Sequence, residues 1–143
     1  MADAKHKLFI NIISQDRQLD TSEADSLTAP TVEGEITVLP GHIPLLARLQ
    51  TGELHYTNNN EIHSFVISKG FIDVGADNHI TVLADTAVAE REISIEKAEE
   101  AIRAAQETMA KSVNEQELFM AEASLKRAFW EIKVAQKTKK TKI

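Results

Sequence analysis

Short apolar runs separated by turn residues fill the first ninety positions of the chain. Gly, Pro, Asn and Asp return about every ten residues between these runs. This rhythm predicts an all-β domain, either a sandwich or a barrel. The strands expected from it span residues 8–14, 18–27, 28–33, 35–39, 45–50, 53–57, 61–68, 70–74 and 79–84.

Two of these runs, residues 65–67 and 80–83, place apolar side chains on both faces of the strand. A strand of an open sheet that faces water is apolar on one face only. We therefore expect an antiparallel β-sandwich of about ten strands in two sheets, with the sheets packed on one another.

The clearest hairpin surrounds Asn58, Asn59 and Asn60, because Asn tolerates the positive φ that short hairpin loops require. A three-residue loop there would pair residue 57 with residue 61 and place His55 opposite His63. Two such histidines form half of a metal site. Alternation along the strands instead puts both on the solvent face, opposite Leu54, Tyr56 and Ile62, and we favour a solvated pair.

After Ala84 the apolar period changes from two residues to three or four, which indicates helices. Residues 88–95 are expected to be the linker, with Ser94 as the N-cap and Glu96 in the first turn. Residues 111–114 separate a first helix from a second, at 115–136. The expected stripes are Ile95, Ala98, Ala101, Ile102, Ala105 and Met109, then Leu118, Ala121, Leu125, Ala128, Ile132 and Ala135. Two such helices joined by a short connector predict an antiparallel hairpin.

The predicted division is therefore a sandwich at residues 1–88 and a helical hairpin at 89–143. The hairpin seam is rich in Ala, which removes little apolar area from water, so a weakly held hairpin is expected. Phe119, Trp130 and Val134 fall outside the seam. This second apolar patch packs on the sandwich or meets a partner protein, and both alternatives stay open.

Charge differs between the two halves. Residues 1–90 carry five basic and thirteen acidic side chains, a net −8, whereas residues 91–143 carry eleven and nine, a net +2. The basic tail consists of Lys137, Lys139, Lys140 and Lys142. The asymmetry indicates either two modules with different partners or an acidic body with a solvated basic end. An acidic body without a basic, aromatic stripe argues against nucleic-acid binding.

Enzyme motifs are absent from the sequence. It has no Cys, no phosphate-binding glycine loop, no HExxH and no GxSxG. The N-terminus does not resemble a signal peptide, and no run approaches the ~20 apolar residues that span a bilayer. Glu33 with Glu35, or His42, are candidates for acid–base chemistry. Nothing in the sequence supplies them with a nucleophile or an apolar pocket, so surface roles are favoured.

The most specific stretch is residues 29–52, which contains the acidic turn Glu33-Gly34-Glu35 and the run Leu39-Pro40-Gly41-His42-Ile43-Pro44-Leu45. It resembles the signature of the F-type ATP synthase epsilon subunit of bacteria. Residues 69–74, with Lys69 where the family has Gly, and residues 80–87 are similar to two further family segments in the same order. The resemblance covers nearly the whole chain.

The resemblance implies a non-catalytic rotor subunit of the proton-translocating synthase, without cofactor or metal. It implies that Thr31, Val32, Glu33 and Gly34 face the membrane-embedded ring of c subunits and that His42 lies near the gamma subunit. Helices of bacterial relatives extend along gamma and stall hydrolysis. Lys126, Arg127, Lys133 and Lys137 would then meet the alpha and beta catalytic subunits. The implied location is the cytoplasmic face of the bacterial inner membrane, through the complex, rather than the thylakoid of a plastid.

Some relatives bind ATP through an Ile-Asp-x-x-Arg-Ala motif at the hairpin. Here Ser94 and Lys97 stand at the Asp and Arg positions, and Lys lacks the planar fork of Arg. We therefore favour Ser94 as a helix cap and Lys97 as a surface residue over a nucleotide site. A free-standing nucleotide-binding module and a hydrolase that uses His42 and Glu33 are the alternative functions.

Overall fold

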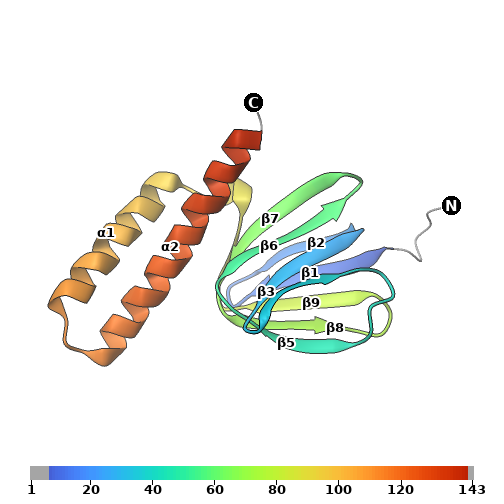
Figure 1. The fold of residues 1–143 in the computed structure, drawn as a ribbon, viewed down its shortest axis with the longest axis horizontal. Helices are drawn as coiled ribbons and strands as arrows, with labels where there is room; N and C mark the ends of the chain where they lie inside the picture. The colour runs from blue at the N-terminus through green and yellow to red at the C-terminus, as the bar shows by residue number, and fades with distance from the viewer. Residues whose placement is uncertain (1–6, 142–143) are drawn as a thin grey trace. The chain divides into compact units, whose positions relative to one another are not determined.

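The computed structural model describes residues 7–141, with side chains up to residue 137. The chain divides into two compact units, Met1–Ala89 and Glu90–Ile143, and each is described by itself (Figure 1). The described part of the first unit is built of strands, and that of the second is helical.

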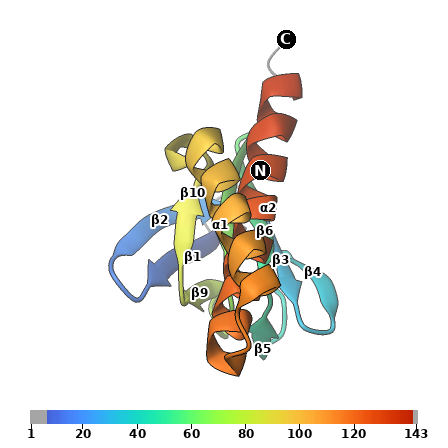
Figure 2. The ribbon, with the colours of Figure 1, turned by 90° about the vertical axis from the view of Figure 1, so that its left-hand side faces the viewer.

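Ten strands make up the described part of the first unit. They are β1 (Leu8–Ser14), β2 (Gln18–Ala24), β3 (Ser26–Thr31), β4 (Gly34–Val38), β5 (Leu45–Leu49), β6 (Gly52–Asn58), β7 (Glu61–Ile67), β8 (Gly70–Val74), β9 (His79–Ala84) and β10 (Ala87–Ala89). The hydrogen-bonded order is β10-β7-β6-β3-β5-β8-β9-β1-β2, and β4 pairs with β3 outside this path. The β3–β4 hairpin projects from the body of the unit (Figure 2).

The predicted sandwich is confirmed, with two corrections. Its layers are not separate sheets, because β3 and β5 are joined through one residue pair, Thr31 with Leu49, where the sheet turns from one layer into the other. The sheet is also not wholly antiparallel, since β1 runs parallel to β9. These two strands are far apart in the sequence, so no tight turn forces them into opposite directions.

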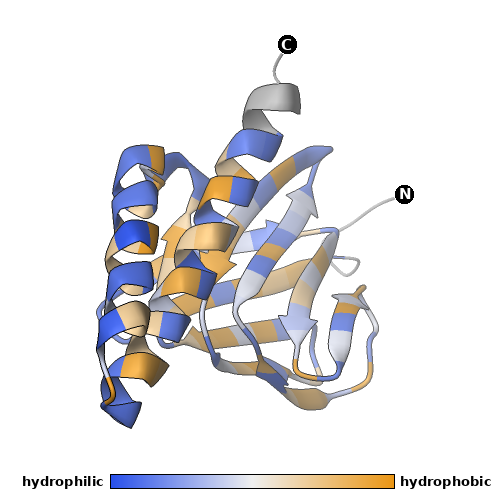
Figure 3. Cartoon of the chain, turned by 60° about the vertical axis from the view of Figure 1, so that its left-hand side comes forward, coloured by the Kyte–Doolittle hydropathy of each residue, from blue (hydrophilic) through white to orange (hydrophobic). Residues whose placement is uncertain are grey.

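Inward-facing residues of the two layers form one apolar core. In β1, Leu8, Ile10 and Ile12 are almost fully buried, while the residues between them are half-buried. Figure 3 shows bands of hydrophobic and hydrophilic residues along the strands. The Tyr56 hydroxyl on β6 donates to Asp20 on β2, so a polar bond also links β2, the last strand of the path, to β6.

The β6–β7 hairpin has a shorter loop than predicted. Asn58 pairs with Glu61, so only Asn59 and Asn60 form the loop. Both have positive φ, 52° and 70°. These are the values of a two-residue type I′ turn, whose twist matches that of the flanking strands.

The shorter loop moves the register by one residue and corrects the predicted histidine pair. His55 lies opposite Ser64, and His63 lies opposite Tyr56. The rings of His63 and Tyr56 are stacked, with 4.9 Å between their centroids. His55 and His63 therefore lie on different faces, and the proposed half metal site does not exist. Ile62, expected to point inward, is 67% exposed.

Two predicted boundaries were also wrong. The break between the second and third strands falls at Asp25, whose carboxylate bonds to neighbouring loops, and not at residues 27–28. The expected linker at residues 88–95 contains most of β10, where Val88 pairs with Val66 of β7. A strand of three residues is too short to reveal its period in the sequence.

Lys7 joins three segments at one end of the sandwich. Its Nζ lies 2.7 Å from Asp25 Oδ1 and donates to the side-chain oxygens of Asn58 and Asn59 at 2.8 and 3.3 Å. The hydrogen bond from Lys7, and a second from the Asn59 backbone, hold the pKa of the Asp25 carboxyl below its ordinary value. The charged carboxylate is therefore favoured in the folded state.

This interaction predicts an acid-dependent loss of stability. Because the folded-state pKa of Asp25 is depressed, its contribution is present above the unfolded value of about 3.9 and disappears as pH falls through the folded value. Asp25→Asn should be less stable than wild type at pH 7, and the difference should shrink below about pH 4. Urea denaturation at both pH values measures this. An unchanged difference would contradict the assignment, and Asp16→Asn is the surface control.

The second unit begins with a short 3₁₀ turn, η2 (Glu90–Glu92), followed by α1 (Ile95–Lys111) and α2 (Glu115–Thr141). The predicted antiparallel hairpin is confirmed (Figure 1). The Ser94 cap is confirmed as well, because its hydroxyl accepts from the Lys97 backbone N–H at 3.3 Å. The second helix is longer than the predicted 115–136, since its polar end continues without an apolar stripe that sequence reasoning could follow.

Small residues form the buried seam of the hairpin. Among the side chains described, the buried ones are Ala98 and Ala105 on α1, and Ala121, Ala128 and Val134 on α2. Each Ala buries only a methyl group, worth about 0.8 kcal/mol, so the apolar contribution to the hairpin is small. The expected Ala-rich seam is confirmed, and a weakly held hairpin stays a prediction.

Candidate functional site: partner-contact surfaces

The turn between β3 and β4 is held rigidly by a side chain of its own. Thr31 and Gly34 form the last pair of the hairpin, and Gly34 has a φ of 122° that a side chain would disfavour. The Thr31 hydroxyl donates to the Gly34 carbonyl oxygen and accepts from the Glu33 N–H at 3.3 Å. Thr31 is 3% exposed, whereas Val32 is 53% exposed, so Val32 and Glu33 form the accessible tip.

Glu33 and Glu35, the candidate acid–base pair, do not lie on the same strand. Glu33 lies in the turn, while Glu35 lies in β4 opposite Pro30. Both side chains are exposed. Water solvates both carboxylates, which gives no structural support for acid–base chemistry at this position.

The loop after β4 presents apolar side chains next to His42. Its turn is closed by a hydrogen bond from the His42 N–H to the Leu39 carbonyl oxygen, 3.0 Å. The His42 ring donates from Nδ1 to the Ile43 carbonyl oxygen, 2.6 Å, so one ring nitrogen is occupied by the loop itself. Leu39 and Ile43 are 55% and 75% exposed, which makes this loop a candidate contact surface.

A third surface was missed by the sequence analysis. On the outer face of the β5-β8-β9-β1 layer, Leu46, Phe71 and Leu83 are 69%, 49% and 48% exposed. Phe71 of β8 pairs directly with Leu83 of β9, and Leu83 pairs with Ile13 of β1. We call Leu46, Phe71, Leu83 and Ile13 the apolar strip.

The apolar strip corrects the interpretation of one of the two two-faced runs, residues 80–83; Phe65, Val66 and Ile67 of β7 are all buried. Ile80 and Val82 point into the core, but Leu83 points outward rather than into a second sheet. The signal was present in the sequence as apolar residues on both faces of β9. Only the register shows that one of the two faces is solvent-exposed.

Two of the candidate cations on α2 are engaged within the helix. Lys126 Nζ lies 3.5 Å from Glu122 Oε1, and Arg127 Nε lies 3.7 Å from Glu131 Oε2. Burial raises the pKa of Glu131, and the charge of Arg127 opposes this. The Lys126–Glu122 pair is exposed, and exposed pairs of this spacing are weak, so a partner can compete for Lys126.

Lys133 is placed differently, with Nζ 4.7 Å from the centre of the Trp130 ring and 5.9 Å from that of Phe129. Phe129 is 55% exposed, so the cation and an aromatic edge are presented together. Lys137 is exposed. The side chains of Lys139 and Lys140, and the whole of Lys142, lie outside the described residues.

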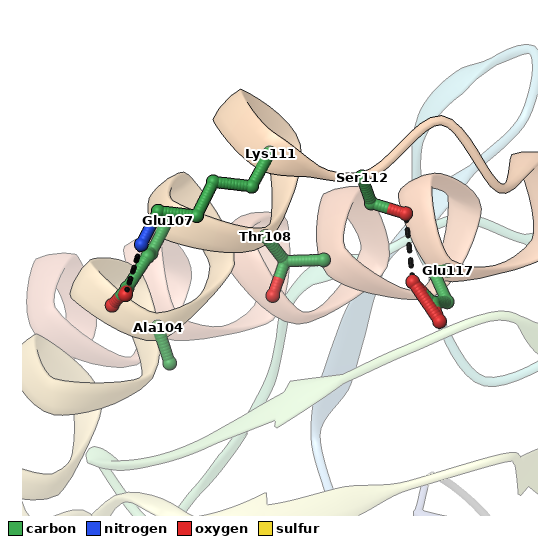
Figure 4. Close-up of a pocket in the computed structure, with 6 residues that line it drawn as sticks. All are labelled: Ala104, Glu107, Thr108, Lys111, Ser112 and Glu117. Atoms are coloured by element: carbon green, nitrogen blue, oxygen red, sulfur yellow. Dashed lines mark hydrogen bonds and ion pairs between the residues drawn. The ribbon is translucent and has the colours of Figure 1, made fainter.

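The tip of the hairpin contains a shallow pocket whose polar groups serve the turn (Figure 4). Glu107 and Lys111 form an ion pair at 3.0 Å, and the Ser112 hydroxyl donates to Glu117 Oε1 at 2.7 Å. The Asn114 side chain accepts from the Glu117 N–H at 3.0 Å and so caps α2. These polar residues therefore stabilise the ends of the two helices.

Nucleotide and metal chemistry gain no support from the described residues. Ser94 is the N-cap of α1, and the Lys97 side chain is exposed. Within the part of the chain whose side chains are described, no group of three or more His, Asp or Glu residues is placed to hold a metal ion. No described helix is long and apolar enough to cross a membrane.

Two family models match this arrangement of domains. The beta-sandwich domain of the ATP synthase delta/epsilon chain matches residues 7–90, and the long alpha-helix domain of the same chain matches residues 91–136. The chain belongs to the ATP synthase delta/epsilon family. Both halves of the chain therefore have counterparts in the family, in the same order.

Similar proteins carry the name ATP synthase epsilon chain. The protein from Dehalococcoides mccartyi is 42% identical over 94% of this chain and 96% of its own length. The protein from Herpetosiphon aurantiacus is 39% identical over 89% and 93%. The resemblance to bacterial epsilon subunits found in the sequence is thereby confirmed for the epsilon-chain family.

Solved structures show the same fold. A chain in the OSCP/F1/c-ring structure of the Euglena gracilis mitochondrial ATP synthase superposes with a TM-score of 0.75 at 25% identity, covering 90% of this chain and 81% of that one. A chain of the Tetrahymena thermophila central stalk and c-ring gives 0.60 at 17% identity, which supports the fold alone.

Proposed function

We propose that this chain is a non-catalytic rotor-stalk subunit of a proton-translocating F-type ATP synthase. Its sandwich grips the gamma subunit and sits on the ring of c subunits, on the cytoplasmic face of a bacterial inner membrane. Family membership over both halves of the chain supports this, as do the stalk and ring assemblies in which the similar structures occur.

The observation that carries the proposal is the apolar strip on a rigid layer. Leu46, Phe71 and Leu83 lie on strands whose opposite face is packed core, so the strip is presented without conformational freedom. Exposed apolar groups on a rigid scaffold are typical of protein interfaces. A gamma subunit that covers the strip can transmit torque to it, because the layer cannot deform independently of the core.

The β3–β4 turn suits the second partner. Val32 and Glu33 project at the end of a hairpin that the Thr31 hydroxyl keeps rigid. The tip is short and stiff and carries one apolar and one charged residue. Such a tip is suited to contact the polar loops of a membrane ring and less suited to insert into a deep groove. We assign Val32, Glu33 and Gly34 to the ring contact, with Thr31 as the residue that shapes it.

The hairpin is assigned a regulatory role. Its seam buries mainly Ala, so partner contacts are able to compete with the folded hairpin. Lys126, Arg127, Lys133 and Lys137 provide cationic groups for acidic loops of the alpha and beta subunits during transient contact. No regulatory ATP binding is assigned to Ser94 and Lys97, because Ser94 already caps the helix.

Deleting residues 91–143 tests both assignments in one complex. The truncated chain should still co-purify with gamma, because the sandwich holds its surfaces without the helices. ATP hydrolysis should rise about twofold or more if the hairpin occupies a stalling position at least half of the time. Hydrolysis by the purified complex, with and without residues 91–143, gives the measurement.

The full-length complex is the control. A complex that carries Lys133→Gln with Lys137→Gln should show a rise in ATP hydrolysis between those of the full-length and truncated complexes. If the full-length chain does not associate with gamma, the stalk assignment fails. If truncation leaves hydrolysis unchanged, the regulatory role fails while the stalk role stands.

A further inference from the structure

One side chain links two loops that are 37 residues apart in the sequence. The Gly41 N–H, in the loop after β4, donates to Asn78 Oδ1 at 2.8 Å. Asn78 ends the turn between β8 and β9. The loop with the family signature is thus fastened to a part of the sandwich that the signature does not include.

Asn78 is a firm anchor. Its carbonyl oxygen accepts from the Phe9 N–H of β1 at 2.8 Å, and the adjoining turn is closed by the Gly75 N–H on the His79 carbonyl oxygen at 2.7 Å. The backbone of Asn78 has a φ of 64°, a left-handed conformation in which Asn and Gly are the favoured residues. Its side chain therefore leaves the backbone in one defined direction.

The other end of the link is a turn with an outward-facing donor. Pro40 and Gly41 occupy its central positions, Gly41 has a φ of 90°, and the His42 N–H bonds back to Leu39. These are the features of a type II turn. Its central N–H does not take part in the turn's own hydrogen bond, and Asn78 is the group that engages it.

The anchored loop presents apolar side chains that are mostly exposed rather than packed on the sandwich. Ile43 is 75% exposed and Leu39 is 55% exposed, so neither holds the loop in place by burial. A loop of this kind loses conformational freedom when a partner binds, and that cost lowers the affinity. A hydrogen bond from a rigid neighbour removes part of the cost beforehand.

We propose that Asn78 is a positioning residue for gamma binding, which fixes the 39–44 loop in its docking conformation through the Gly41 N–H. The inference rests on the proposed function, together with the position of His42 near gamma that the family resemblance implies. Asn78 itself makes no contact with the partner in this assignment. Its effect passes through the turn at Pro40 and Gly41.

Two substitutions separate the side chain from the backbone. Asn78→Gly keeps the left-handed backbone and the bond from Phe9 but removes the acceptor for Gly41. Asn78→Asp keeps an acceptor oxygen at the same place. Binding is measured as the Kd for the full chain rebinding to a catalytic complex that contains gamma but lacks this subunit, and the Gly41 amide is followed by NMR hydrogen exchange.

Asn78→Gly should speed exchange of the Gly41 amide and raise Kd roughly 5- to 10-fold, the value of one modest hydrogen bond. Asn78→Asp should restore slow exchange and a Kd within about twofold of wild type. If Asn78 had a purely structural role, its substitution would lower the melting temperature, but the Kd for gamma would not differ between Asn78→Gly and Asn78→Asp.

Three results would overturn the inference. If Asn78→Gly speeds exchange of the Gly41 amide but leaves the Kd unchanged, the hydrogen bond forms but does not prepare the loop for binding gamma. Unchanged exchange in Asn78→Gly would show that the bond does not form in solution. An unchanged Kd for Ile43→Ser would remove the loop from the interface, and the stalk assignment would survive that outcome if Phe71→Glu still prevents rebinding. Failure of the wild-type chain to rebind would instead contradict the proposed function itself.

Discussion

Gly70→Ala should unfold the sandwich at a much lower temperature than wild type. Gly70 begins β8 and is paired on both sides, with Leu49 of β5 and Ala84 of β9. A Cβ atom added there would lie 1.9 Å from the Leu83 carbonyl oxygen and 2.8 Å from the Ala84 Cα. Both are backbone atoms of a paired strand, so no side-chain rotation relieves the overlap.

The expected loss is about 3 kcal/mol or more in the free energy of unfolding, at the upper end of overpacking effects. For a domain of this size, that lowers the melting temperature by roughly 12 to 24 °C. Tyr56 is the only Tyr of the chain and lies in the sandwich, so its near-ultraviolet circular dichroism follows the transition of this unit.

Gly75→Ala is the matched control. A Cβ at Gly75 would meet the His79 carbonyl oxygen at 3.2 Å, a tight contact that a small shift relieves. We expect its cost to stay below about 1 kcal/mol. Equal melting temperatures for the two variants would contradict the assignment of a close backbone approach at Gly70.

Phe71→Glu should prevent stable association with gamma while leaving the fold intact. Phe71 and Leu83 are paired at the centre of the apolar strip, and each is about half exposed in the free chain. A carboxylate at Phe71 stays solvated in the free chain, whereas gamma binding would remove water both from it and from Arg48, the residue paired with position 71 on β5. The Kd for rebinding to a catalytic complex that contains gamma should rise at least about 100-fold, or about 2.7 kcal/mol.

Ile62→Glu provides the comparison, because it introduces the same charge at another exposed apolar residue. Ile62 is 67% exposed and lies on the outer face of β7, in the other layer. Its Kd should stay within about threefold of wild type. An unaffected Phe71→Glu variant would remove gamma from the apolar strip, and equal losses in both variants would point to a general charge effect.

Local chemistry allowed the sequence to predict some elements closely. The Ser94 cap and the Ala stripes are properties of single helices, in which residues three and four apart share a face. The strands at residues 70–74 and 79–84 were predicted because Gly and Asn mark the turns around them. The long signature at residues 29–52 identified the family, and the matches over both domains confirmed it.

The candidate site was predicted less completely. The Thr31–Gly34 turn was found, but Thr31 is a buried support rather than an exposed contact. Asn78 was missed, because its partner Gly41 lies 37 residues away and nothing in the sequence pairs them. The His55–His63 pair was wrong because one residue of loop length decides which face each histidine occupies.

The sequence by itself determined the change of period near residue 90, the two kinds of unit and the family, since these depend on neighbouring residues and on continuous motifs. The tertiary structure alone decided the parallel pairing of β1 with β9, the face to which Leu83 points and the bond between Gly41 and Asn78. The reason is physical: strand partners and register depend on which distant segments bury the most apolar surface together, and no local pattern records that choice.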